Sequence, residues 1–169
     1  MNEHKQNLIK EYNKVFDAIS NYHYCVPFAL DFIESDEFFI ANCDIENYKI
    51  NVNEKHLKTR SLSFTFIHEF SHAICHLNNL NYMKNGKLMW HHLEFAIINH
   101  CLQDKIINPK IKTYFNSYDI HEDIIYEKLG VNPFKYNEMI SNIKFKTISE
   151  LVEIAQKKAT EIRKKFTQD

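Results

Sequence analysis

The sequence predicts a single α+β domain in which helices predominate. Only 2 glycines and 3 prolines occur in 169 residues, which favours long helices and argues against an all-β sandwich. Apolar residues recur at helical spacing at the start of the chain and again from residue 62 onward. Between these segments, residues 24–53 carry short apolar or alternating runs typical of strands. A hydrophobic fraction of 44% is enough for one core, so we expect one domain spanning residues 1–169.

The N-terminal half is expected to contain one helix followed by three strands. The helix spans residues 3–20, and its apolar face comprises Leu8, Tyr12, Val15, Phe16 and Ile19. The strands lie within YCVPFALDFI, EFFIANC and YKINVN, which are broken by Pro27, Asp36 and Asn47. In the last of these runs Ile50 and Val52 share one face. Together the three runs predict a small antiparallel or mixed sheet.

The rest of the chain is expected to be helical. The helical period runs from Leu62 to Ile107 and is interrupted by a polar loop over residues 78–87. A helical C-terminal part follows over about residues 118–166. It contains a short helix ending at Gly130 and a longer one with Thr147 or Ser149 as its N-cap. The basic residues that end the last helix are expected to be solvated: Lys157, Lys158, Arg163, Lys164 and Lys165.

The stretch FTFIHEFSHAICH contains the pattern HExxH at residues 68–72. On a helix, His68 and His72 lie about 40° apart on one face, so both imidazoles reach a single ion. The apolar residues of this helix cluster on roughly the opposite side, which leaves the histidines outside the core-facing stripe. Glu69 lies beside them, where a carboxylate can take a proton from metal-activated water. The motif therefore predicts a zinc site with Glu69 as general base.

The third zinc ligand has three candidates at the start of the next helix. The extended pattern HExxHxxGxxH is excluded because Cys75 and Asn78 occupy the extra positions. His76 lies near the end of its helix, where such a side chain commonly caps carbonyl groups. The remaining candidates are His91, Glu94 and His92. His91 begins the apolar stripe of its helix and is expected to point towards the HExxH helix, with Glu94 as its main rival.

The segment from Phe38 to Ile107 resembles the SprT-like and related small zincin metallopeptidases. The resemblance rests on HEFSH at 68–72 and WHHLEF at 90–95, which match a pattern of HExxH, a loop, and a histidine opening a helix with an aromatic residue four positions later. His91 and Phe95 occupy those two positions. The resemblance implies a zincin-like fold, with the active-site helix packed under a short sheet, and cleavage of peptide bonds.

A second family is also similar. RSLSFTFIHEFSHAICH resembles the ImmA/IrrE type of regulatory metallopeptidase, in which an arginine and FT precede the HExxH helix. That family takes a glutamate from the following helix as a ligand and acts on repressors, so this resemblance implies Glu94 in place of His91.

Three hypotheses about function follow. In the first, the chain is a zinc metalloendopeptidase whose protein or peptide substrate pairs with a sheet edge, for which KINVN is the candidate strand. Tyr82, His92 and Tyr114 are candidate donors to the oxyanion. In the second, a closed zinc site bound by both His91 and Glu94 serves a regulatory or adaptor domain. In the third, no metal binds and the chain is a helical interaction module.

Charge, hydropathy and cysteine content indicate which partners and which cellular location to expect. The formal net charge is −1, with 21 basic and 22 acidic residues, so a nucleic-acid role has little support and no global field favours a membrane. No apolar run approaches the 18 or so residues of a membrane span, and the N-terminus lacks a signal-peptide pattern, so we expect a cytoplasmic protein. The four cysteines form no CxxC pair, which predicts reduced and mostly buried thiols: Cys25, Cys43, Cys75 and Cys101.

Overall fold

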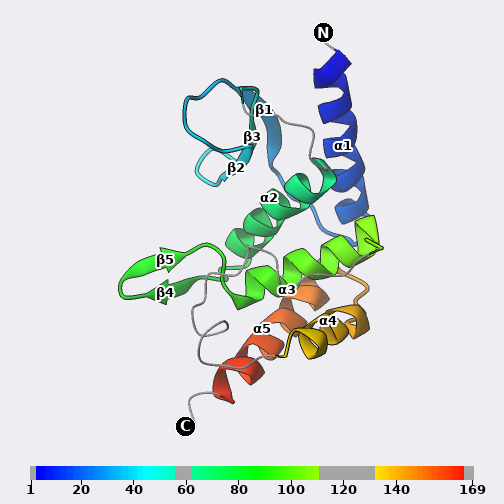
Figure 1. Cartoon of the computed structure of the whole chain (residues 1–169), viewed down its shortest axis with the longest axis vertical. Coiled ribbons are helices and arrows are strands. Elements are labelled where there is room, and N and C mark those ends of the chain that lie inside the picture. The colour runs from blue at the N-terminus through cyan, green and yellow to red at the C-terminus, as the bar shows by residue number, and fades with distance from the viewer. Residues whose placement is uncertain (1–2, 56–61, 111–131, 166–169) are drawn as a thin grey trace.

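A small sheet lies above a stack of helices in the computed structural model, which describes residues 3–55, 62–110 and 132–165 (Figure 1). The structure therefore confirms a mixed α+β architecture with a helical C-terminal part. Its elements in chain order are α1 (Glu3–Ser20), β1 (Ala29–Ile33), β2 (Ala41–Asp44), β3 (Lys49–Asn53), α2 (Leu62–Leu77), β4 (Tyr82–Lys84), β5 (Lys87–Met89), α3 (Leu93–Leu102), η1 (Gln103–Ile107), α4 (Pro133–Asn142) and α5 (Ile148–Lys164).

Helix α1 packs its predicted apolar face against α2. Leu8, Val15 and Ile19 are at most 1% exposed. The ring of Tyr12 lies 5.6 Å from that of Phe66 and 5.4 Å from that of Phe70, and its hydroxyl donates to the carbonyl oxygen of Phe28 at 2.5 Å. Because this hydroxyl is satisfied inside the core, a tyrosine is tolerated there. Helix α1 thereby fixes α2 from the side away from the histidines.

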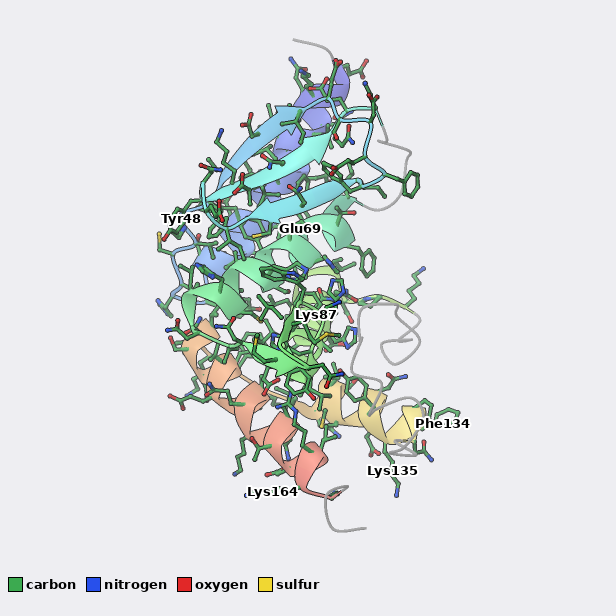
Figure 2. The ribbon with its side chains drawn as sticks, turned by 90° about the vertical axis from the view of Figure 1, so that its left-hand side faces the viewer. Tyr48, Glu69, Lys87, Phe134, Lys135 and Lys164 are labelled. Atoms are coloured by element: carbon green, nitrogen blue, oxygen red, sulfur yellow. The ribbon has the colours of Figure 1, made fainter. Side chains whose placement is uncertain are left out.

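The three strands form a mixed sheet in the order β1-β3-β2. Strand β3 is parallel to β1 and antiparallel to β2. It comes last of the three in the sequence and lies in the centre of this sheet. Its residues Ile50, Val52 and Asn53 are all essentially buried, whereas β2 is mostly half-exposed. A central strand is covered on both edges, which suits the more buried sequence. Strand β2 is therefore a sheet edge, and it lies beside α2 (Figures 1 and 2).

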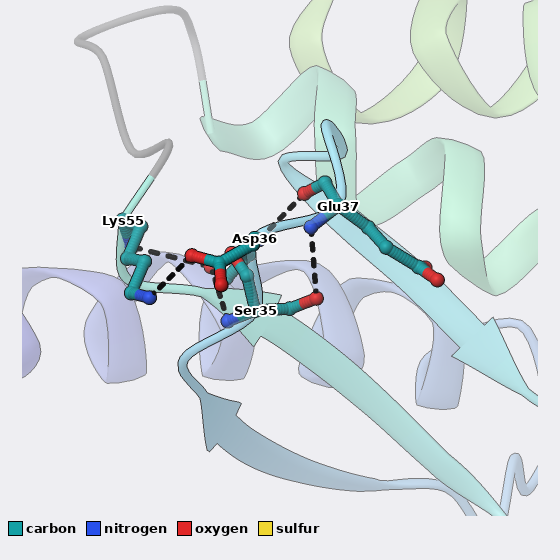
Figure 3. Close-up of polar contacts among 5 residues, drawn as sticks. Ser35, Asp36, Glu37 and Lys55 are labelled. Atoms are coloured by element: carbon teal, nitrogen blue, oxygen red, sulfur yellow. Dashed lines mark hydrogen bonds and ion pairs between the residues drawn. The ribbon is translucent and has the colours of Figure 1, made fainter.

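Asn53 fixes the loop that leads from β1 into β2, in which Figure 3 labels Ser35, Asp36 and Glu37. Its side chain is 0% exposed and makes four hydrogen bonds. The amide nitrogen donates to the carbonyl oxygens of Ser35 and Glu37 at 3.0 and 3.1 Å, and the amide oxygen accepts from the N–H groups of Ser35 and Lys55 at 3.2 Å each. Lys55 also pairs with Asp36 at 2.7 Å. A buried amide with all its groups satisfied holds a loop in one conformation, and here it sets the start of β2.

The segment expected as a polar loop contains a β-hairpin, which corrects that prediction. Strands β4 and β5 pair antiparallel, with Tyr82 opposite Met89. The two turn residues, Asn85 and Gly86, both have positive φ, at 52° and 74°. These are the conformations of a type I′ turn, for which Asn-Gly is the preferred pair. The dipeptide was therefore a readable hairpin signal, and the hairpin leads directly to residues 90 and 91.

The C-terminal helices support α3 from below. Helix α5 packs along α3, and Thr147 caps it by accepting from the N–H of Glu150 at 3.1 Å, as predicted. Helix α4 was not predicted, although Asn132 at its N-cap and Pro133 in its first turn are typical start signals. A buried hydrogen bond of 2.9 Å between His100 Nδ1 and the Tyr136 hydroxyl joins α3 to α4. The predicted helix ending at Gly130 lies outside the described residues.

Candidate metal centre

Helix α2 places two histidines side by side over the core. The apolar face of α2 anchors it in the core. Its residues are 0–1% exposed: Phe66, Phe70, Ala73 and Ile74. Leu77, on the same face, is partly buried. His68 and His72 project from the opposite side, are half-buried, and have Nε2 atoms 3.2 Å apart. The i, i+4 spacing of an α-helix produces this proximity. His76, one turn on, is exposed and lies outside the cluster.

His91 reaches the same point from the start of α3. It follows the β4–β5 hairpin and precedes His92, the N-cap of α3, whose Nδ1 accepts from the N–H of Phe95 at 3.3 Å. The Nε2 atom of His91 lies 3.2 Å from that of His68. Hairpin and cap together fix the backbone on both sides of this residue. The prediction that His91 points towards the HExxH helix is confirmed.

The geometry of the three imidazoles fits a tetrahedral metal ion. Their ligand atoms all lie within 4.8 Å of one another, and two of the three pairs are 3.2 Å apart. In a tetrahedral zinc site, nitrogen ligands at about 2.0–2.1 Å from the ion are about 3.3–3.4 Å from each other. An ion placed between them can take one imidazole nitrogen from each of the three residues as a ligand.

Phe95 forms the floor beneath the three rings. It is 0% exposed, and its ring centroid lies 5.1 Å from His68, 4.3 Å from His72 and 5.1 Å from His91. The contact with His72 is stacked, at an interplanar angle of 24°. Because this ring touches every imidazole, it restricts how each can rotate and so preorganises the set.

A cleft of about 300 Å³ opens over the histidines. Edge strand β2 contributes Ala41, Asn42 and Cys43 to its wall, while Glu69 comes from α2. Figure 2 shows Glu69 on α2 beneath the sheet. The Glu69 side chain is 6% exposed and lies close enough to Cys43 to influence its thiol. Burial, with the carboxylates of Glu69 and Asp44, raises the pKa of Cys43 to about 12, so this thiol stays neutral. Glu69 therefore faces the same cleft as the histidines, as its position in the motif predicts.

Glu94, the rival for third ligand, is engaged elsewhere. Its carboxylate receives both terminal nitrogens of Arg163 at 2.5 and 2.6 Å and lies 3.1 Å from His92 Nδ1. Its carboxylate lies outside the cluster that His68, His72 and His91 form. His92 is 3% exposed and serves as the α3 N-cap. Neither rival therefore contributes to the histidine cluster.

Arg163 departs from the expectation that the basic end of α5 is solvated, whereas Lys157, Lys164 and Lys165 are exposed as expected. The Arg163 side chain is 25% exposed, and its guanidinium lies 4.9 Å from the ring centroid of Tyr82 as well as on Glu94. The interaction crosses from α5 to the start of α3, which no local pattern reveals. The ring of Tyr82, one of the candidate oxyanion donors, is thus in contact with the Arg163 guanidinium. Tyr114, another, lies outside the described residues.

No known family model, curated protein or solved structure matches this chain. The relation to SprT-like or ImmA/IrrE-type peptidases therefore stays a prediction, and the site is interpreted from its own geometry. Within the described residues, no helix combines the length and apolar character that crossing a membrane requires. The four cysteines are all unpaired; Cys75 and Cys101 are buried as expected, whereas Cys25 is exposed.

The Glu94–Arg163 pair predicts a specific pH dependence of stability. Burial alone would raise the pKa of Glu94, but the contact with His92 and the hydrogen bonds and positive charge of Arg163 together outweigh it and lower that pKa to about 2. Because the folded-state pKa lies below the ordinary value of 4.5, the stabilisation is present above about pH 4.5 and is lost as the pH falls towards 2. Arg163→Met should cost about 1–3 kcal/mol at pH 7 and progressively less below pH 4.5.

Urea unfolding of both proteins in the presence of a chelator, from pH 7 to pH 3, measures this difference. Lys158→Met is the matched control, because its pair with Glu161 is exposed and screened by solvent, so its loss should leave stability nearly unchanged at every pH. A cost of Arg163→Met that stays constant over the whole pH range would contradict the assignment of the effect to Glu94.

Proposed function

We propose that this protein is a zinc-dependent peptidase that cleaves peptide bonds with Glu69 as general base. The observation that carries the proposal is the convergence of three Nε2 atoms, from His68, His72 and His91, at the base of a cleft that Glu69 also lines. Three protein ligands with an accessible fourth position are typical of catalytic rather than structural zinc sites.

The donor set favours zinc among the common metals. Imidazole nitrogen suits zinc, copper, iron and nickel, whereas calcium and magnesium prefer oxygen ligands. Ligand separations near 3.2 Å agree with a tetrahedral arrangement, and tetrahedral coordination is what zinc adopts most often. His68, His72 and His91 would hold the ion, and the Phe95 ring would keep their orientation.

The chemistry divides between the ion and the chain. A zinc ion held there would lower the pKa of a water molecule towards neutrality and polarise the carbonyl group of the substrate. Glu69 would accept the proton of the attacking water and pass it to the leaving amine as the C–N bond breaks. Its low exposure, 6%, limits competition from bulk water for that proton.

The substrate main chain would pair with β2 rather than with β3. The expectation that KINVN forms the edge is wrong, because β3 is paired on both sides. Asn42 accepts a hydrogen bond from the Asn51 side chain at 3.0 Å, and Ala41, Asn42 and Cys43 of this edge strand all border the cleft. An extended peptide added to this edge would gain main-chain hydrogen bonds that do not depend on its sequence.

A closed structural zinc site has less support than a catalytic one. It requires a fourth protein ligand, and Glu94, the candidate for that place, is paired with Arg163 and His92. The same pairing favours the SprT-like resemblance over the ImmA/IrrE type, because the former takes a histidine at the position of His91.

Metal analysis with a chelator tests the proposal directly. Protein purified without an affinity tag should contain close to one zinc per chain, and it should cleave unfolded casein until the zinc is removed with 1,10-phenanthroline. Readdition of zinc should restore cleavage. Protein with no bound zinc, or casein cleavage that survives removal of the metal, would contradict the proposal.

A further inference from the structure

Trp90 is a large apolar side chain held at the wall of the cleft. It lies between β5 and α3, immediately before His91, and is 52% exposed. Its ring centroid is 6.2 Å from that of His72, with the two planes at 86°. Five large hydrophobic side chains are exposed among the described residues: Phe38, Tyr48, Met83, Trp90 and Phe134. Of these five, only Trp90 lines the cleft. An exposed indole beside a candidate reaction centre is a typical ligand contact.

The remaining wall of the cleft has matching chemistry. Strand β2 and the residue after it supply Ala41, Cys43 and Ile45, which are small or apolar, together with the uncharged Asn42. Apart from Glu69 and the three histidines, the described lining residues carry no ionisable side chain other than the Cys43 thiol. A charged substrate side chain seated against Trp90 and Ile45, rather than against Glu69, would lose hydration without gaining a counter-charge.

We infer that Trp90 and the apolar residues of β2 form a specificity pocket for an aromatic or large aliphatic side chain, carried by the substrate residue next to the cleaved bond. This inference rests on the proposed peptidase function. Burying such a side chain against an indole gains both apolar area and ring contact. Seating it would also hold the adjacent peptide bond near the histidines, because the indole and His72 are in contact.

A panel of blocked octapeptides tests this pocket. The peptides share an alanine–glycine–serine background, carry a fluorescein label, and differ in one central residue, which is Phe, Leu, Lys or Asp. We expect the zinc-loaded protein to cleave the Phe and Leu peptides with kcat/KM at least about 10-fold above the Lys and Asp peptides. Mass spectrometry of the products should place the cut next to the central residue.

Binding provides a readout that does not depend on turnover. Zinc-loaded Glu69→Gln protein should bind the Phe peptide about 10-fold more tightly than the Asp peptide, as measured by fluorescence anisotropy. Because Trp90 is the only tryptophan of the chain, its own emission should also shift on binding of the Phe peptide and remain unchanged with the Asp peptide.

Three variants separate specificity from structure. Trp90→Ala should retain zinc but reduce the preference for Phe over Asp to about 3-fold or less, whereas Trp90→Phe should keep most of it. Phe134→Ala is the matched control, because Phe134 is 82% exposed on α4, far from Glu69 (Figure 2), and its loss should leave the preference unchanged.

The possible failures are distinguishable. A protein that binds no zinc and cleaves no peptide contradicts the proposed function itself. Zinc binding and cleavage without preference for Phe or Leu overturns the specificity pocket alone, as does an unchanged preference in Trp90→Ala. Loss of zinc from Trp90→Ala would assign this residue to the support of His72 and would also overturn the pocket.

Discussion

Glu69→Gln is expected to lower peptide cleavage by at least about 10²–10⁴-fold while the protein keeps its zinc. Glutamine has the same shape as glutamate, so the buried position of Glu69 should remain filled and the three histidines should keep their places. The variant cannot accept a proton, which removes the proposed general base and leaves the ligands untouched. The rate of cleavage of labelled casein, together with zinc content by atomic absorption, measures both effects.

Glu138→Gln provides the control for this substitution, since Glu138 is exposed on α4 and should be neutral in both assays. Undiminished cleavage by Glu69→Gln would eliminate the mechanism. Loss of zinc from the variant would also contradict it, because Glu69 would then be a ligand rather than a base.

His91→Ala is expected to weaken zinc binding by more than about 100-fold, since changing even an outer partner of a zinc ligand typically costs 10–100-fold. Of the three ligands, this one comes from outside α2, so its removal leaves only the i, i+4 pair, which cannot enclose an ion. A competition titration with a fluorescent zinc chelator measures the affinity. Thermal unfolding should show that added zinc raises the Tm of the parent protein but not that of His91→Ala.

His76→Ala is the matched control for His91→Ala. His76 is an exposed histidine near the end of α2, outside the cluster, and its removal should leave zinc affinity unchanged. If His91→Ala bound zinc normally and Glu94→Gln did not, the third ligand would be Glu94, and the interpretation of the Arg163 pair would fail with it.

Local patterns predicted the elements whose causes are local. The face of α1, the two histidines of α2 and the cap at Thr147 each depend on residues within one or two turns of one another, and all three are as predicted. The β4–β5 hairpin and α4 were missed although Asn85-Gly86 and Asn132-Pro133 carry recognised signals. Both signals are local, because each consists of two adjacent residues with a preferred turn or cap conformation.

Other features depended on contacts between distant segments. The strand order β1-β3-β2 left KINVN in the centre of the sheet and made β2 the edge that borders the cleft. Trp90 gave no periodic signal, and its place beside His72 follows from the hairpin that precedes it. Arg163 reached Glu94 across 69 residues of sequence. Such pairs form only when the whole chain has packed, so no window of sequence contains them.

The sequence by itself determined the pair of histidines and the adjacent glutamate, because one turn of helix sets their relative positions regardless of the rest of the fold. The tertiary structure decided which of His91, Glu94 and His92 lies beside His68 and His72. The cap of α3 directed His92 inward, the guanidinium of Arg163 engaged Glu94, and His91 was left facing His68 and His72. The place of His91, which belongs to the segment before α3, is fixed by packing and ion pairing between elements, which act only in the folded chain.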